Sequence, residues 1–133
     1  MTELKPYADL LARVLLAVLF IIAGFGKLGD VQGFTGYMTS GGVPAFLAWP
    51  TILLELLGGI AILVGFQTRI VAFALAGFCL LSAVLFHLVP ADQMQMTSFY
   101  KNLGLAGGYI LLVIHGAGRF SADAYLAAKS ATA

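Results

Sequence analysis

The sequence predicts an all-α membrane protein, a single domain over residues 1–133 built as a bundle of four transmembrane helices. Of the 133 residues, 61% are hydrophobic and only 10% are charged, whereas about a quarter of the residues of a typical soluble domain are charged. Four apolar stretches of about twenty residues take up most of the chain, and each is long enough to cross a hydrocarbon core of roughly 30 Å. This leaves no room for a second, water-soluble domain.

The first predicted span covers about residues 10–28. No small-x-small cleavage site followed by a polar region comes after it, so we interpret it as a retained helix and not as a signal peptide. Residues 30–43 mix aromatic residues with Gly and Thr, a composition typical of a short interfacial helix or a loop at the lipid head groups. Gly41, Gly42 and Pro44 mark the end of this segment.

The second predicted span, about residues 45–66, contains Trp49 and Pro50 near its start, which fit an interfacial anchor and a first-turn proline. The third, about residues 69–89, is almost purely apolar and stops at Pro90. Both lengths match a membrane crossing.

A polar loop, residues 90–97, leads into the fourth predicted span, about residues 98–117, and a short polar tail follows. Gly116 and Gly118 are suited to ending this helix. Glycines elsewhere in the spans predict close helix packing, because small residues let helix backbones approach in lipid. The glycines concerned are Gly58, Gly59, Gly104 and Gly108.

The basic residues predict the orientation of the bundle. Lys27 and Lys101 lie at one side of the membrane, and the other five lie at the side shared by both termini and the second loop. Those five are Lys5, Arg13, Arg69, Arg119 and Lys129. The positive-inside rule therefore predicts that the N- and C-termini are cytoplasmic.

Several classes of chemistry find no support in the sequence. The net charge of +1 is dispersed, which argues against nucleic-acid binding. The single cysteine, Cys79, excludes an intrachain disulfide or a CxxC pair, so electrons would have to travel on another group. His87 and His115 fall near opposite membrane faces and form no HxxxH or ExxH pattern, so we expect neither a metal nor a haem. The glycines of residues 24–26 lie within an apolar helix and predict no nucleotide loop.

Glu55 is the most unusual residue of the predicted spans. It lies about ten residues into its helix and hence near the bilayer midplane, where a carboxylate must be protonated, hydrated or paired. Arg13 and Lys27 lie four turns apart on one face of the first helix, and either could pair with it. A purely structural ion pair is therefore an open alternative to a functional carboxylate.

Four other polar residues lie at the exterior ends of three helices, with Glu55 deeper on the remaining one: Lys27, His87, Lys101 and Asn102. If these faces converge, they form an outward-opening polar pocket suited to an anionic or quinone-like head group. Lysine and histidine would donate hydrogen bonds to a carbonyl oxygen, and Glu55 would supply or accept a proton. Simple snorkelling of the two lysines and an interfacial role for His87 are the alternatives. We expect Arg13 and Arg69 to have structural or pairing roles.

The chain resembles the DoxX family of small bacterial inner-membrane proteins over about residues 10–125. The resemblance rests on the order of Arg13, GFGKL at 24–28, ELLGGIAILVG at 55–65, Arg69, KNLGLAGG at 101–108 and GAGRFSAD at 116–123. It implies four transmembrane helices in the inner membrane and points to Arg13, Lys27, Glu55, Lys101 and Asn102 as site positions. The last motif departs from the commoner GPGRxSLD at Ala117 and Ala122.

The resemblance also implies a redox context. A related subunit, DoxD, belongs to a thiosulfate:quinone oxidoreductase, and mycobacterial relatives are linked to a membrane-associated oxidoreductase complex. We therefore expect a membrane subunit of, or accessory to, a quinone-linked oxidoreductase system, acting with partner subunits or as a homo-oligomer. Whether the chain is itself catalytic stays open. The alternatives are a non-enzymatic membrane anchor or assembly partner and, with least support since no inverted repeat is visible, a small-solute or proton transporter.

Overall fold

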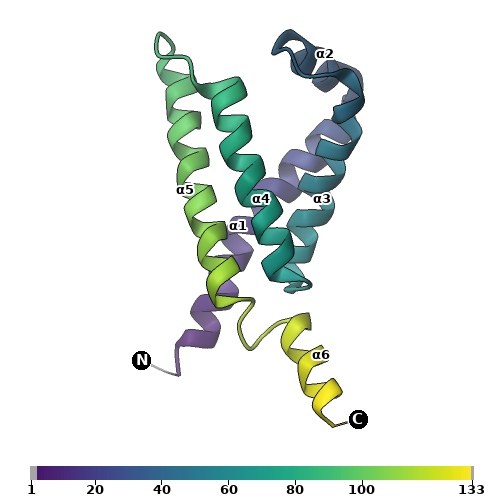
Figure 1. The fold of residues 1–133 in the computed structure, drawn as a ribbon, viewed down its shortest axis with the longest axis vertical. Helices are drawn as coiled ribbons and strands as arrows, with labels where there is room; N and C mark the ends of the chain where they lie inside the picture. The colour runs from purple at the N-terminus through teal and green to yellow at the C-terminus, as the bar shows by residue number, and fades with distance from the viewer. Residues whose placement is uncertain (1–2, 133) are drawn as a thin grey trace.

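The computed structural model describes residues 3–132, and all regular structure in that range is helical (Figure 1). In chain order the elements are α1 (Lys5–Gly29), α2 (Val31–Ser40), the 3-10 turn η1 (Ala45–Leu47), α3 (Ala48–Val64), α4 (Thr68–Ser82), the π-helical turn η2 (Ala83–His87), α5 (Gln93–His115) and α6 (Ala122–Ala131). The predicted all-α class is confirmed.

Three helical stretches within residues 3–132 are long and apolar enough to cross a membrane. They are Lys5–Gly29, Ala45–Val64 and Thr68–His87, and an 18-residue window within each has a mean hydropathy of 2.3, 2.0 and 2.3. The fourth long helix, α5, has 23 residues, a length of roughly 34 Å. It is not among the three, since Lys101, Asn102 and several glycines lower its mean hydropathy.

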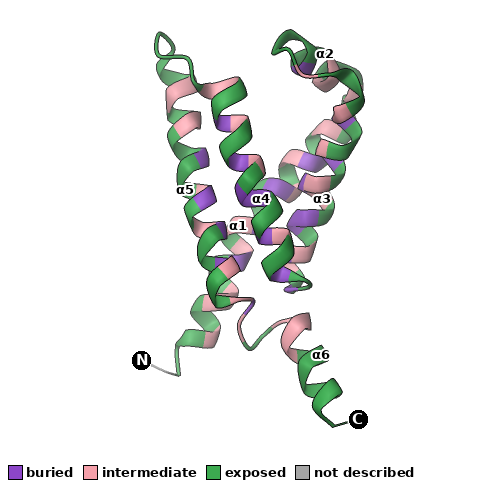
Figure 2. Ribbon diagram, viewed as in Figure 1, coloured by how far each residue is buried: buried purple, intermediate pink, exposed green. Residues whose placement is uncertain are grey.

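The outward faces of the long helices are exposed (Figure 2) and carry large apolar side chains. Leu15, Ile22, Ile70 and Phe73 are each between 66% and 73% exposed. Soluble proteins rarely expose contiguous apolar patches of this kind. The surface therefore has the character of a lipid-facing one.

The four long helices form two pairs. Helix α1 packs along α3 and α4 packs along α5, and the pairs diverge toward the end that carries α2 (Figure 1). Glycine allows the closest approach of α1 and α3. A Cβ on Gly24 would lie 2.8 Å from Leu56 Cβ, and one on Gly59 would lie 2.9 Å from Ile21 Cγ1. Without a hydrophobic drive between helices in lipid, such small-residue contacts are a main source of association.

The predicted packing role of glycine is confirmed at three positions and wrong at one. Gly59 meets α1 as described above, and added Cβ atoms on Gly58 and Gly108 would lie 3.4 Å from Leu75 Cδ2 and 3.0 Å from Leu16 Cδ2. At Gly104, however, an added Cβ would meet no described atom within 4 Å. The prediction fails there because Gly104, one turn before Gly108, lies on the exposed surface of α5 and has no helix in close contact.

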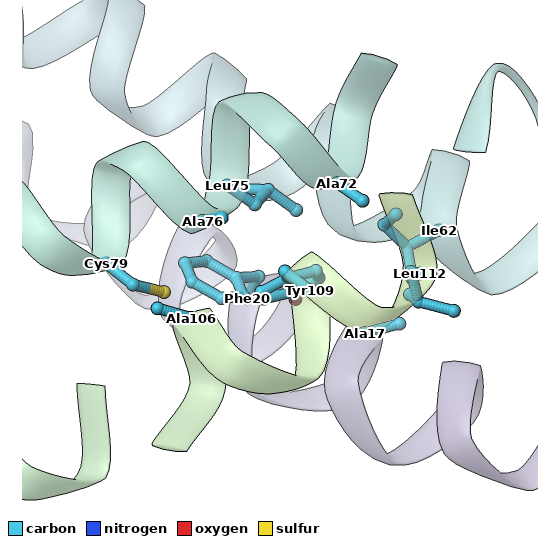
Figure 3. Packing of buried hydrophobic residues seen from close by; sticks show 10 residues of the cluster. All are labelled: Ala17, Phe20, Ile62, Ala72, Leu75, Ala76, Cys79, Ala106, Tyr109 and Leu112. Atoms are coloured by element: carbon cyan, nitrogen blue, oxygen red, sulfur yellow. The ribbon is translucent and has the colours of Figure 1, made fainter. Parts of the chain in front are cut away.

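A buried apolar cluster joins the two helix pairs (Figure 3). Its members are Ala17, Phe20, Ile62, Ala72, Leu75, Ala76, Cys79, Ala106, Tyr109 and Leu112. The rings of Phe20 and Tyr109 lie 5.6 Å apart between centroids. The Tyr109 hydroxyl donates a hydrogen bond of 2.9 Å to the Leu16 carbonyl, which provides the partner that a buried phenol needs. This cluster anchors α5 to α1 below the divergence.

The predicted third span agrees closely with the helical stretch Thr68–His87, whereas the predicted start of the fourth span is wrong. The α-helical part of the third ends at Ser82 and passes into the π-helical turn η2. The fourth begins at Gln93, inside the predicted loop, because the Asp92 carboxylate accepts hydrogen bonds from the backbone N–H groups of Met94 and Gln95 at 2.9 and 3.1 Å. Such an N-cap satisfies donors that the first helical turn leaves free.

The C-terminal tail contains a helix that the sequence analysis missed. Helix α6 starts after Ser121, whose hydroxyl accepts a hydrogen bond of 3.2 Å from Ala124 N. Helix α5 ends at His115, and Gly116 and Gly118 adopt positive φ angles of 78° and 77°. This confirms the predicted termination by glycine. The start of α1 and helix α6 both lie opposite the α2 end of the bundle (Figure 1).

Candidate functional site

A cavity of about 280 Å³ lies where the two helix pairs diverge. Its polar lining includes all five residues that the sequence analysis assigned to an outward-opening pocket: Lys27, Glu55, His87, Lys101 and Asn102. Its other lining residues are Leu19, Phe20, Ala23, Phe34, Tyr37, Met38, Thr51, Phe78, Ser82 and Phe86. A small polar set within an aromatic wall is the usual composition of a small-molecule pocket.

Lys27 of α1 and Glu55 of α3 form an ion pair across the first helix pair. Lys27 Nζ lies 2.6 Å from Glu55 Oε2, and the two side chains are 23% and 6% exposed. The Lys27 ammonium also lies 5.1 Å from the centroid of the Phe34 ring. A buried carboxylate is tolerated when a cation compensates it. Of the two partners that the sequence left open, the structure pairs Glu55 with Lys27.

Asn102 and Ser82 connect the second helix pair at the cavity. Asn102 is 8% exposed, and its Nδ2 lies 3.4 Å from Ser82 Oγ, a long hydrogen bond. The Ser82 hydroxyl in turn donates to the Cys79 carbonyl at 3.2 Å. The contact with Ser82 leaves most of the hydrogen-bonding capacity of the Asn102 side chain available, because its amide carries two N–H donors and an acceptor oxygen.

The π-helical turn η2 brings His87 and Phe86 to the cavity. His87 Nδ1 lies 2.7 Å from Gln95 Oε1 at the start of α5, so Nε2 is the ring nitrogen available to a ligand. Phe86 stacks on Tyr37 of α2 with ring centroids 5.1 Å apart and an interplanar angle of 25°. The wider turn of a π-helix shifts the following side chains, and such turns are frequent at functional sites.

Lys101 gives the cavity its net charge. Lys27 and Glu55 compensate each other, whereas no acidic side chain among residues 3–132 lies within ion-pairing distance of Lys101. Lys101 is exposed and lines the cavity. A lysine of this kind offers hydrogen-bond donors and one positive charge to a carbonyl oxygen or an anion.

Within the described range no group of three or more His, Cys, Asp or Glu residues is arranged to hold a metal ion.

Sequence reasoning missed the part that α2 plays in this cavity. The aromatic residues of 30–43 led to the prediction of an interfacial helix or loop, and α2 is indeed a short helix. Its Phe34, Tyr37 and Met38 line the cavity, and Met38 is buried. The aromatic content of the segment was the available signal. Its placement over the cavity depends on contacts with α3 and η2 that no local pattern encodes.

Arg13 and Arg69 lie at the opposite end of the bundle and do not reach the cavity. Arg13 is 1% exposed, and its Nη2 donates a short hydrogen bond to the Phe120 carbonyl. Arg69 is exposed and packs beside Gly116, since its Nε lies 3.4 Å from where a Cβ of that glycine would be. Arg13 therefore holds the chain that follows α5, and the alternative pairing of Arg13 with Glu55 is wrong.

Asp123 fastens the same C-terminal segment to the turn between α3 and α4. Its carboxylate accepts hydrogen bonds from the backbone N–H groups of Gln67 and Thr68 at 2.7 and 2.9 Å. Its own N–H donates to the Gly65 carbonyl at 2.9 Å. A carboxylate at these positions satisfies the free donors of the first turn of α4 and interacts favourably with the helix dipole. We call Arg13, Gly65, Phe120 and Asp123 the C-terminal clasp.

The clasp responds to acid through Asp123. Burial raises the pKa of the Asp123 carboxyl, but the hydrogen bonds from Thr68 and Gln67 and the charge of Arg13 outweigh burial, so the pKa lies below its usual value. The pKa of Asp123 is lower in the folded protein than in the unfolded chain, where it is about 3.9. The stabilisation that Asp123 gives the folded protein is therefore complete at pH values above the unfolded pKa. It is lost as the pH falls through the lower pKa of the folded protein.

We expect Asp123→Ala to loosen α6 at neutral pH by about 1 to 2 kcal/mol, the usual effect of removing a helix cap. Hydrogen exchange of α6 measures this, and wild-type α6 should lose protection when the pH is lowered from 7 to about 3. Asp30→Ala is the matched control, because Asp30 caps α2 by accepting a hydrogen bond from Gly33 N at 2.8 Å and does not touch the clasp. Equal protection of α6 in wild type and Asp123→Ala would contradict this role.

Comparison with known proteins gives consistent results. The family model described as DoxX matches residues 8–88. The chain is 46% identical over 129 residues to "Inner membrane protein YqjF" of Escherichia coli (strain K12), with 97% of this chain and 99% of that protein covered. It is 34% identical over 126 residues to "Inner membrane protein YphA" of the same strain, with 90% of both covered.

A more distant relative has a name that refers to an activity. The chain is 33% identical over 90 residues to "Putative oxidoreductase CatD" of Bacillus subtilis (strain 168), with 68% of this chain and 66% of that protein covered. No solved structure matches the chain at a significant level.

Proposed function

The chain belongs to the DoxX family of membrane proteins, and from that premise we propose that it is a membrane subunit of, or accessory to, a quinone-linked oxidoreductase system. One observation carries the proposal: five polar side chains from four helical segments line a single cavity that aromatic rings enclose. The relative whose printed name refers to an oxidoreductase supports the redox class. We propose the quinone as ligand because the cavity combines hydrogen-bond donors with flat apolar walls.

The donor set fits the head group of a quinone. Lys101 and Asn102 would donate hydrogen bonds to a carbonyl oxygen, and His87 Nε2 would provide a further polar contact. Lys27 holds the Glu55 carboxylate by a single contact to Oε2, so Oε1 is left to supply or accept a proton at that carbonyl. A bound quinone supplies two-electron, two-proton chemistry, and a partner oxidoreductase subunit would exchange the electrons.

We also propose that α5 is a fourth transmembrane helix and that both termini are cytoplasmic. The length of α5 is sufficient for a crossing, and its polar residues Lys101 and Asn102 both line the cavity. The basic residues of the clasp end, including Arg69 and Arg119, outnumber those of the α2 end, which favours cytoplasmic termini. Reporter fusions at both termini that are active on one side only test this orientation, and an exterior signal would overturn it.

Quinone binding to the purified protein in lipid nanodiscs tests the functional proposal. We expect wild type to retain extractable quinone and to bind added quinone saturably. Lys101→Ala should weaken binding about tenfold, because a hydrogen bond from a charged donor is lost, and Glu55→Gln should also weaken it. Lys129→Ala is the matched control, since Lys129 lies in α6, remote from the cavity. Absence of saturable binding to wild type, or equal binding by all four proteins, would overturn the proposal.

A second candidate function is a membrane anchor or assembly partner. The observation that favours it is the ion pair itself, since Lys27 and Glu55 already compensate each other at 2.6 Å and such pairs can serve helix packing alone. This candidate predicts that Glu55→Gln lowers stability or the recovery of partner subunits and leaves small-molecule binding unchanged. The quinone titration above separates the two functions.

A further inference from the structure

The cavity is closed by protein on the side of α2. Phe34, Tyr37 and Met38 of that helix line it, and the stack of Tyr37 on Phe86 links α2 to the turn η2. Gly41 reinforces this link, because a Cβ there would lie 2.5 Å from Phe86 Cε1. Helix α2 therefore covers the face where η2 approaches the first helix pair, and an apolar ligand would have to displace packed rings to enter there.

The seam between α1 and α5 also lies between the two helix pairs. Near the centre of the bundle it is tightly closed, since Gly108 contacts Leu16 and Tyr109 donates a hydrogen bond to the Leu16 carbonyl. One helical turn closer to the cavity, Gly104 is exposed, and an added Cβ there would meet no described atom within 4 Å, so α5 makes no close contact at this position. Leu19, one turn above Leu16 on α1, lines the cavity and is also 37% exposed.

The margins of this seam are apolar. Leu16, Leu19 and Ala23 follow the i, i+3, i+7 spacing of one helix face, and Leu19 and Ala23 both line the cavity. On α5, Gly104 lies one turn before Gly108, which contacts Leu16, and carries no side chain. Lys101, whose ammonium can extend toward the membrane surface, is nearly one turn farther on and lines the cavity. The opening therefore joins the polar lining of the cavity to the lipid-facing surface through apolar atoms.

We propose that the α1–α5 seam is a lateral portal, through which a lipid-dissolved quinone places its head group in the cavity while its isoprenoid tail stays in the bilayer. This inference rests on the proposed function and narrows its ligand to a long-tailed, membrane-borne quinone. The cavity volume of about 280 Å³ is at the lower limit for ligand pockets of roughly 300 to 1,000 Å³. It therefore suits one substituted ring and leaves a long tail outside, and the seam gives that tail an apolar path.

Photocrosslinking tests where the tail lies. The probe is a quinone that carries a diazirine in the first unit of its isoprenoid tail, added to the full-length protein in nanodiscs, with mass spectrometry to map the labelled residues. We expect labelling on α1 around residues 19–23 and on α5 around residues 101–105, and excess unlabelled long-tailed quinone should abolish it. Labelling concentrated on α2, α3 or α4, or spread without competition over the lipid-facing surface, would overturn the portal.

A matched pair of variants gives an independent readout. Leu19→Trp places a large ring in the seam, whereas Leu15→Trp places the same ring one turn away on the same helix, at a residue that is 66% exposed and does not line the cavity. We expect Leu19→Trp to weaken binding of the long-tailed quinone about tenfold and a tailless ring analogue much less, with Leu15→Trp close to wild type for both. Equal binding of the long-tailed quinone by the two variants would overturn the portal.

The outcomes separate this inference from the proposed function. If wild type binds neither the long-tailed quinone nor the tailless analogue, the proposed function fails and the portal fails with it. If wild type binds both, and crosslinks and variants do not implicate the seam, only the portal fails. Far-ultraviolet circular dichroism of both tryptophan variants verifies that any loss of binding does not arise from misfolding.

Discussion

Replacing Lys27 with methionine is expected to lower the free energy of unfolding by about 3 kcal/mol, because it leaves a buried carboxylate without its cation. The Glu55 side chain is only 6% exposed and Lys27 Nζ is its ion-pair partner. Methionine keeps most of the volume and the apolar stem of lysine, so the variant removes charge with little change in packing. Denaturant titration in micelles, followed by circular dichroism, measures the change.

Two further variants identify the cause of this loss. The double variant Lys27→Met/Glu55→Gln removes both charges and is expected to recover much of the stability, since an isolated buried charge costs more than no charge. Lys101→Met is the control, because Lys101 lines the same cavity and has no acidic partner in the described chain. It should change stability by less than about 0.5 kcal/mol. Similar losses for Lys27→Met and Lys101→Met would contradict the role of the ion pair.

Replacing Gly65 with alanine is expected to destabilise the protein by about 2 to 4 kcal/mol and to release the C-terminal segment. Gly65 has a φ angle of 72°, a left-handed conformation that costs other residues roughly 1 to 2 kcal/mol. A Cβ there would also collide with Arg13 Nη1 and lie 2.5 Å from Ser121 Cβ, and such overpacking adds about 1 to 3 kcal/mol. The alanine therefore forces apart the residues that form the clasp.

Thermal unfolding and limited proteolysis measure these two effects of Gly65→Ala. The protease should cut within residues 116–131 much faster than in wild type. Gly77→Ala is the matched control, because Gly77 lies inside α4 and a Cβ there would meet no described atom within 4 Å. Alanine should stabilise that helix by roughly 0.5 to 1 kcal/mol. Unchanged stability and proteolysis in Gly65→Ala would show that the clasp does not hold the tail.

The helical architecture could be predicted because its signal is local. Long apolar runs interrupted by Pro and Gly predicted the long helices, and the observed ends differ by a few residues where an individual cap decides, as Asp92 does for α5. The fourth membrane crossing stays a prediction, because Lys101 and Asn102 interrupt the apolar run of α5 and the helix is not among the three stretches that are long and apolar enough to span. Only their position on the cavity shows why an otherwise suitable helix carries them.

The candidate site could be predicted in composition but not in arrangement. Ionisable residues within apolar spans are costly, and this rule alone pointed to Glu55 and Lys27. Which cation reaches Glu55 depends on which helix face packs against α3, and Gly24 and Gly59 determine that face through their contacts with Leu56 and Ile21. The C-terminal clasp was missed because Asp123 reaches across 55 residues of sequence to Thr68.

The sequence by itself determined that this is an all-α membrane protein of a recognisable family, and which polar residues such a protein must accommodate. Those conclusions follow from composition, span length and the cost of burying charge, which depend little on how the helices pack. Only the tertiary structure decided that Lys27 and not Arg13 pairs with Glu55, that α2 contributes to the cavity wall, and that Leu19 lines the cavity while partly exposed. The physical reason is that these contacts depend on distances between segments remote in the chain.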